Sequence, residues 1–149
     1  KQASEFAGAV PVRHLLPYWK TSNRYLFSGG SVNMRDAAVY AKEENWSKAV
    51  ELWKQTYETK KGKQKMYAAY NTALGYEMQD SIDTALEWAL KAQTLAREKS
   101  KTDKKETGEI HDGTISYYIF ISMYVDELEK RKEGMARLNM QMNRFDDDF

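Results

Sequence analysis

The residues able to do acid–base or metal chemistry are few and scattered along this chain. Its two histidines, His14 and His111, lie far apart in the sequence, and it has no cysteine. His111 is followed by Asp112, but adjacent residues on a helix do not face each other and cannot act as a pair. Glu43-Glu44 and Asp146-Asp147-Asp148 gather carboxylates without a matching basic or metal-binding group. We therefore expect no metal, no cofactor and no catalytic residue.

The motifs of familiar enzymes are also missing. The sequence has no G-x-S-x-G, P-loop, H-E-x-x-H, dinucleotide glycine motif or EF-hand loop. The net charge is +1, from 23 basic and 22 acidic residues, so no overall field attracts nucleic acid. No apolar run approaches the roughly 20 residues that span a bilayer. These features predict a protein that is not an enzyme, binds no nucleic acid and does not insert directly into a membrane.

Aromatic residues suggest binding instead, because the chain has four tryptophans, ten tyrosines and five phenylalanines. Tyrosine offers a large contact area with a polar tip at modest entropic cost, which suits peptide recognition. Tyr67 and Tyr70 would lie on one helix surface. The candidate partner-binding residues on this surface and its counterpart earlier in the chain are Lys42, Tyr67, Tyr70, Leu74, Glu77 and Met78. The alternative is that the ends of the chain cover this surface.

The segment that would position these residues is a repeat between residues 33 and 96. Ala49 and Ala85 align its two copies at a period of 36 residues, which is typical of helical hairpins that stack into a solenoid. The copies span 33–61 and 65–98, and each reads as a helix, a tight turn with a polar cap, and a second helix. In the first copy, Asn45 is well placed to cap the second helix. The predicted fold class is all-α, with both hairpins in one domain over residues 1–149.

The two ends differ in character from the repeats. Residues 1–30 form an N-terminal arm, in which 2–16 have a helical composition and 18–27 are expected to be extended or irregular chain lying on the helices. Residues 99–109 are strongly charged, which predicts a connecting loop or a frayed helical turn. A long C-terminal helix is predicted over 106–143.

An apolar stripe along this C-terminal helix steps by four and three residues in turn, as in a coiled coil. It consists of Tyr117, Ile121, Tyr124, Leu128, Arg131, Met135, Leu138 and Met142. The favoured interpretation is a helix that caps the open end of the repeats. The alternative is a structural spacer, or a weak homodimer that uses the stripe over 117–142.

The two copies resemble the tetratricopeptide repeat. Its small and aromatic positions are filled by Ala37, Tyr40, Ala49 and Trp53 in the first copy, and by Ala73, Tyr76, Ala85 and Ala92 in the second. The match is partial, because the proline that commonly ends a repeat is replaced by Lys61 and Arg97. The resemblance implies an α-α superhelix whose concave groove binds a protein or peptide.

A narrower resemblance covers nearly the whole chain. The order LLPYWKTSNRYLFSGG, MRDAA, NWSKAVELW, AAYNTALGYE and TALEWALKA is similar to the C-terminal half of a family of Bacteroidetes-type envelope lipoproteins, for which no activity is known to us. It implies that this chain is a fragment of a longer protein, with an anchor upstream of Lys1. A periplasmic or outer-membrane-anchored location is then expected.

Overall fold

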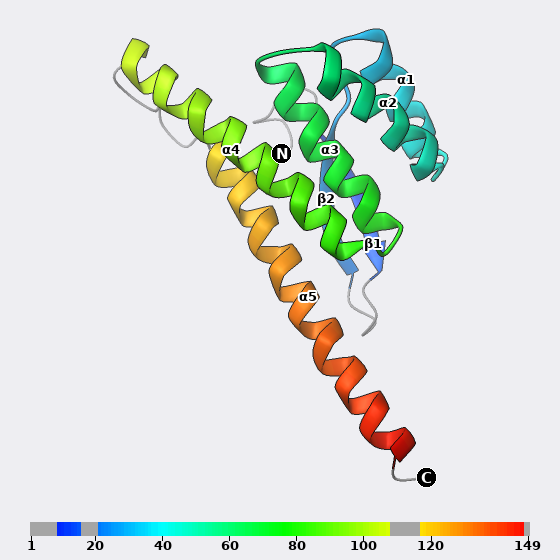
Figure 1. The fold of residues 1–149 in the computed structure, drawn as a ribbon. Helices are drawn as coiled ribbons and strands as arrows, with labels where there is room; N and C mark the ends of the chain where they lie inside the picture. The colour runs from blue at the N-terminus through cyan, green and yellow to red at the C-terminus, as the bar shows by residue number, and fades with distance from the viewer. Residues whose placement is uncertain (1–8, 16–20, 108–116, 148–149) are drawn as a thin grey trace.

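The structure is a computed structural model that describes residues 9–15, 21–107 and 117–147 (Figure 1). It is all-α in class, with packed helical hairpins and a long C-terminal helix, which confirms the predicted fold class. In chain order the elements are β1 (Ala9–Leu15), β2 (Thr21–Phe27), α1 (Val32–Lys42), α2 (Trp46–Thr59), α3 (Lys63–Met78), α4 (Ile82–Thr107) and α5 (Tyr117–Asp147).

The turns within the two helical hairpins have the same geometry 36 residues apart. Glu44 and Asp80 both have a positive φ, near 61° and 62°, which is the left-handed conformation that often ends a helix. After these residues, Asn45 N–H donates to the carbonyl of Tyr40, and Ser81 N–H donates to that of Tyr76. The predicted cap is present, because the Asn45 side chain accepts from Lys48 N–H. The two turns therefore share their backbone conformation and their hydrogen bonds.

The helices pack in sequence order, α1 on α2, α2 on α3, α3 on α4 and α4 on α5. The contact between α3 and α4 is close because α4 presents small side chains to it. Ala85, Ala89, Ala92 and Ala96 are each at most 1% exposed, and small residues let neighbouring helix axes approach each other. Trp53 on α2 is fully buried and fills the space beside α3.

The N-terminal arm is where the structure departs most from the sequence prediction. The helical composition of residues 2–16 is misleading, because Ala9–Leu15 is a strand paired antiparallel with β2. Extended chain was predicted for 18–27 and is confirmed over 21–27. The β-branched Val10 and Val12 favour a strand, and Pro11 is tolerated because β1 has no described strand on its other side. The hairpin lies behind α3 (Figure 1).

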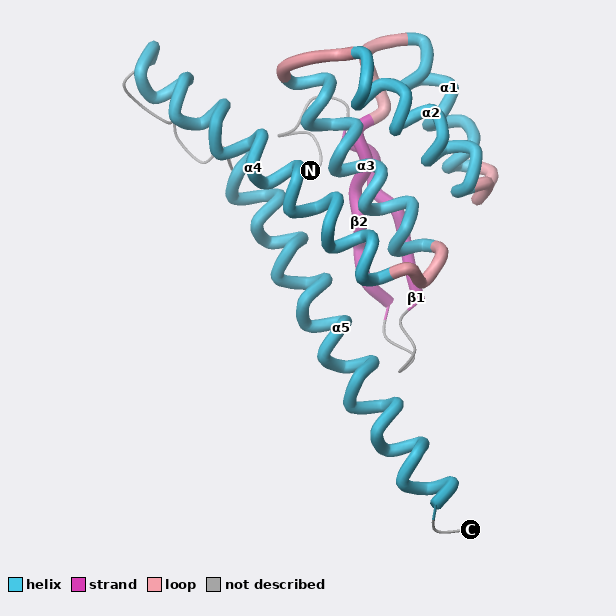
Figure 2. The backbone as a smooth tube through the Cα atoms, in the orientation of Figure 1, coloured by secondary structure: helices cyan, strands magenta, loops and turns pink. Residues whose placement is uncertain are grey.

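The C-terminal part differs in where its helices begin and end. Residues 99–109 were predicted as a loop or a frayed helical turn, and the structure continues α4 as a helix to Thr107. The helix predicted over 106–143 is α5, which begins at Tyr117, and residues 108–116 lie outside the described part. The first half of α5 packs beside α4, whereas its second half extends beyond the other helices to the C-terminus (Figure 2). None of the described helices is long and apolar enough to cross a membrane.

Candidate functional site

Four of the six predicted partner-binding residues lie in the protein interior. Tyr67 is 9% exposed, Tyr70 is 1% exposed, and Leu74 and Glu77 are fully buried. These residues therefore do not form the open groove that was predicted from their positions on α3. The arm and the C-terminal helix cover them, which was the alternative left open by the sequence. Lys42 is exposed and Met78 is partly exposed, so these two retain access to solvent.

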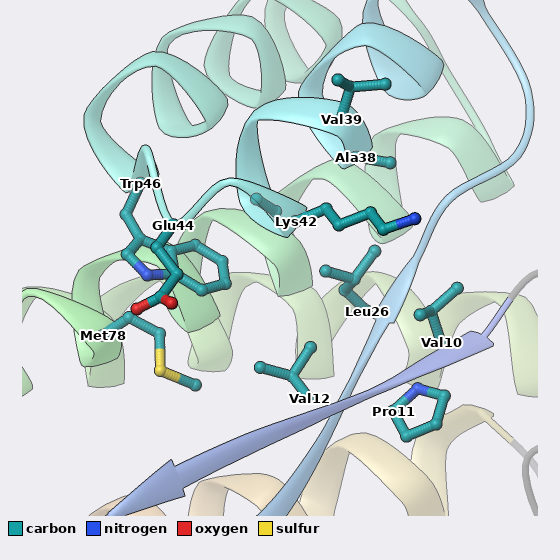
Figure 3. Close-up of a pocket in the computed structure, with 11 residues that line it drawn as sticks. Val10, Pro11, Val12, Leu26, Ala38, Val39, Lys42, Glu44, Trp46 and Met78 are labelled. Carbon is teal, nitrogen blue, oxygen red and sulfur yellow. The ribbon is translucent and has the colours of Figure 1, made fainter.

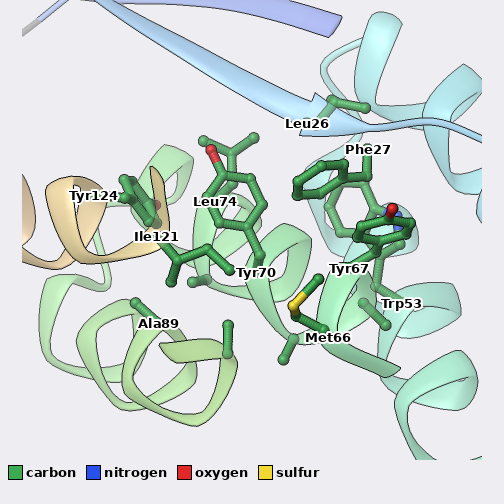
Figure 4. Close-up of a cluster of buried hydrophobic side chains, with 14 of the residues drawn as sticks. Leu26, Phe27, Trp53, Met66, Tyr67, Tyr70, Leu74, Ala89, Ile121 and Tyr124 are labelled. Atoms are coloured by element: carbon green, nitrogen blue, oxygen red, sulfur yellow. The ribbon is translucent and has the colours of Figure 1, made fainter. Parts of the chain in front are cut away.

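The covered part of the groove is an aromatic cluster centred on Phe27 of β2 (Figure 4). The Phe27 ring stacks on Tyr67, with ring centroids 4.2 Å apart. It meets Tyr70 edge-on at 5.2 Å and Phe120 of α5 edge-on at 6.0 Å. The Tyr67 hydroxyl shares a hydrogen bond of 2.8 Å with that of Tyr117. Aromatic pairs of this kind stabilise by about 0.5–1.5 kcal/mol each beyond the area that they bury.

Side chains of helix α3 also form hydrogen bonds with the backbone of β2, as a receptor does with an extended peptide. The Asn71 side chain accepts from Phe27 N–H at 2.9 Å and donates to the Phe27 carbonyl at 2.7 Å. The Tyr70 hydroxyl donates to the Tyr25 carbonyl at 2.6 Å. These backbone groups on the edge of β2 that faces α3 are therefore hydrogen-bonded to side chains rather than to a third strand. Asn71 was not among the predicted site residues.

Glu77 is the centre of a buried charge network that joins three parts of the chain. Arg24 of β2 donates to both carboxylate oxygens, with its closest contact at 2.9 Å from Nη2 to Oε2. Arg131 of α5 donates from Nη1 to Oε2 at 3.1 Å, and the Tyr124 hydroxyl donates to Oε1 at 3.0 Å. Arg131 also pairs with the exposed Asp80 at 3.0 Å. Glu77 of α3 thus binds both covering elements, β2 through Arg24 and α5 through Arg131 and Tyr124.

The ionisation of this network follows from its geometry. Burial alone would raise the pKa of Glu77, but the hydrogen bond and charge of Arg24, with Arg131 and Tyr124, hold that pKa below its usual value. Burial and the neighbouring Glu77 raise the pKa of Tyr124 well above its usual value. The Glu77 carboxylate is therefore ionised, and both of its oxygens already accept hydrogen bonds. A general base instead needs a lone pair within reach of a substrate proton. Among the described residues, no three histidine, aspartate or glutamate side chains gather as a metal site requires.

An open hollow lies between α1 and β1, away from the aromatic cluster (Figure 3). Its volume is about 840 Å³. It contains the two predicted residues that are not buried, Lys42 and Met78. The full lining is Val10, Pro11, Val12, Leu26, Ala38, Val39, Ala41, Lys42, Glu44, Trp46 and Met78. Most of these side chains are apolar, and the charged groups Lys42 and Glu44 are both exposed.

The apolar stripe of α5 is divided between the interior and the surface. Ile121, Tyr124 and Leu128 are buried, at 0%, 5% and 0% exposure, and Tyr117 is partly buried. Beyond Arg131, Leu138 and Met142 are 44% and 57% exposed. The first half of the stripe therefore packs inside one chain, and a homodimer seam on the stripe stays a prediction for its lower part. Only the second half stays open to a partner.

The chain matches a known family over most of its helical part. A family described as a domain of unknown function (DUF6340) matches residues 35–130, well over half of the chain. The chain belongs to this family. Its match covers both helical hairpins and the buried half of α5, and it ends just before Arg131. No curated protein matches, and no solved structure matches. The tetratricopeptide and envelope-lipoprotein resemblances therefore stay predictions.

Proposed function

We propose that this member of the DUF6340 family is a non-catalytic peptide-interaction module. The observation that carries the proposal is the apolar hollow between α1 and β1, which the described residues leave open. Its partner would be an extended segment of another protein with apolar side chains at every second position. The contacts between α3 and β2 provide a precedent within the chain, because there an extended segment lies on the concave face.

An extended partner fits the hollow because β1 forms one of its walls. The carbonyls of Tyr25 and Phe27 accept hydrogen bonds from α3 side chains and therefore point away from β1. Pro11 lies opposite Tyr25 in the antiparallel pair. Since opposing residues in such a pair point their backbone groups either both toward each other or both away, the backbone of Pro11 faces the outer edge of β1. This edge has no described strand beside it. An incoming strand could pair there while its apolar side chains enter the hollow, as in recognition by strand addition. Pro11 lacks an N–H, so the apolar contacts must provide much of the affinity.

A binding measurement with a defined peptide tests this proposal. The probe is a fluorescein-labelled peptide of alternating valine and threonine, and its binding is followed by fluorescence anisotropy. Val39→Asp places a charge in the hollow at a position that is 56% exposed, so it should leave the fold intact. We expect this change to weaken binding by about tenfold or more, because the charge must lose its hydration when the peptide covers it.

The matched control is Val32→Asp on the same helix. Val32 is 60% exposed and does not line the hollow, so this variant should bind as the wild type does. Equal weakening by both variants would indicate a general charge effect and reject the hollow as the site. Failure of the wild-type protein to bind the peptide would reject an extended apolar partner.

A further inference from the structure

We propose that the projecting part of α5, from Lys130 to Arg144, docks an acidic amphipathic helix of a partner protein. This surface is separate from the hollow and does not depend on it. The segment carries exposed apolar side chains. Its described salt bridges to other parts of the chain are all at its beginning, where Arg131 binds Glu77 and Asp80 and Lys132 binds Asp83. A single helical segment of this length is marginal in water without packing.

The apolar surface of the projecting segment continues the seam that is already packed inside the protein. Met135, Leu138 and Met142 follow Tyr124, Leu128 and Arg131 with the same alternation of three and four residues. Side chains at this spacing lie on one side of a helix and pack against another helix. The partner helix would thus lie in line with α4, whose start is marked by the salt bridge between Asp83 and Lys132. This continuity favours a helix over a flat lipid surface.

A row of cations beside the apolar surface specifies the charge of the partner. Lys130, Arg137 and Arg144 are spaced by seven residues and therefore lie on one side of α5. A hollow of about 570 Å³ brings the two kinds of side chain together, since Lys130 and Arg137 line it with Met135 and Leu138. Lys130 and Arg137 are paired with Glu127 and Glu133 at 3.9 and 3.7 Å. These exposed pairs contribute little and leave both cations accessible.

A second copy of this chain is a poorer match than an acidic helix. In an antiparallel pair with twofold symmetry, equivalent flanks of the two helices face each other. The row of Lys130, Arg137 and Arg144 would then meet its own copy. In a parallel pair, it would meet the opposite flank, where the described side chains include Lys132 and Asn139. The carboxylates beside the row, Glu127 and Glu133, already pair with Lys130 and Arg137 of their own helix, so a different protein with free carboxylates is the better match in charge.

The test uses two synthetic amphipathic helices with leucine at the a and d heptad positions. One has glutamates on both flanks of the leucines, and the other has lysines there. We expect the full chain to bind the glutamate peptide and to bind the lysine peptide at least about tenfold more weakly, as measured by fluorescence anisotropy at low salt. The double variant Arg137→Glu/Arg144→Glu should reverse this preference.

The matched pair Leu138→Gln and Met140→Gln separates the apolar surface from a general effect. Met140 is 61% exposed and lies on the opposite side of the helix, because two residues turn it by about 200°. Leu138→Gln should weaken binding of the glutamate peptide, and Met140→Gln should not. Circular dichroism checks that both variants keep their helicity.

Three results would overturn the proposal. One is binding to vesicles with anionic lipid but to neither peptide, which would indicate a membrane surface. Another is a dimer in sedimentation without peptide that Leu138→Gln abolishes, which would indicate a second copy. The last is a wild-type protein that binds the two peptides equally or not at all.

Discussion

The two helical hairpins place equivalent positions of their first helices in opposite environments. Ala38 and Leu74 are 36 residues apart and occupy the same place in the repeat, as do Ala41 and Glu77. Leu74 and Glu77 are fully buried beneath the covering elements. Ala38 is only partly buried and lines the open hollow, and Ala41, although it is 5% exposed, also lines that hollow rather than lying beneath the covering elements. The backbone geometry is shared, so the difference lies in the side chains and in what packs against them.

Position 39 and its equivalent, position 75, show the same contrast. Gly75 lies against α2, where a side-chain Cβ would meet Val50 and Trp53. Val39 is 56% exposed and lines the hollow, because no described helix packs on α1 from that side. The first hairpin therefore presents to solvent the face that the second hairpin buries. This comparison explains why we expect a partner to bind beside the first hairpin, whereas the N-terminal arm and the C-terminal helix cover the second hairpin.

Removing the centre of the charge network should give the largest effect on the second hairpin. Glu77→Ala leaves Arg24 and Arg131, 5% and 4% exposed, buried without their carboxylate. Loss of one partner from a buried pair typically costs about 3–5 kcal/mol. We expect a decrease of this size in the free energy of unfolding, measured by urea denaturation. The control is Asp80→Asn, which removes the charge of a 72% exposed partner of Arg131 but keeps a residue type that tolerates the positive φ at this position, and it should cost at most about 1 kcal/mol. Similar costs for the two variants would contradict the role of Glu77.

Acid should weaken the same network without a mutation, and by less than complete removal of the side chain. The pKa of Glu77 is lowered in the folded protein, whereas in the unfolded chain it is near the usual value of about 4.3. The stabilisation is therefore complete above that value and is lost as the pH falls through the folded pKa. Urea denaturation between neutral and acidic pH should show a steeper loss of stability for the wild type than for Glu77→Gln. Parallel profiles would show that Glu77 does not carry this dependence.

The sequence was sufficient to predict the helical body because that body depends on local signals. Asn45 caps α2, and the alanines from Ala85 to Ala96 repeat at helical spacing. The helix predicted in the N-terminal arm is wrong over residues 9–15, because composition was given more weight than Val10, Pro11 and Val12; residues 2–8 and 16 lie outside the described part. In such a segment, pairing with another strand decides the structure, as local propensity is easily overridden.

The predicted binding surface was only partly right for a related reason. A helix face with Tyr67, Tyr70 and Glu77 has the chemistry of a binding groove, and it does bind an extended segment, which is β2 of the same chain. Sequence periodicity identifies the face of a helix but not what covers it. Arg24 and Arg131 were the available signal, since a glutamate on an otherwise apolar face needs a cation when it is buried.

Filling the space at Gly75 tests how tightly the second hairpin packs on the first. Gly75→Ala should cost about 1–3 kcal/mol in the free energy of unfolding, because the new methyl group meets the Val50 side chain in a packed interface. The second change Val50→Ala should recover part of this loss. Gly134→Ala is the control, since a Cβ there meets nothing within 4 Å, and it should stabilise by about 0.5–1 kcal/mol. A stabilising Gly75→Ala would show that the contact is looser than described.

The smallest effect on stability, and the sharpest test of the comparison, comes from giving the first hairpin the side chain of the second. Ala38→Leu copies Leu74 into the hollow. Since Ala38 is only partly buried, the free energy of unfolding should change by no more than about 0.5 kcal/mol. The leucine would occupy the space proposed for the peptide, so binding of the valine–threonine peptide should be lost. Ala136→Leu adds the same atoms at an exposed position of α5 and should not alter binding. If Ala38→Leu bound the peptide as well as the wild type does, the open end of the concave side would not be the binding site, and side-chain size would not explain the contrast between the hairpins.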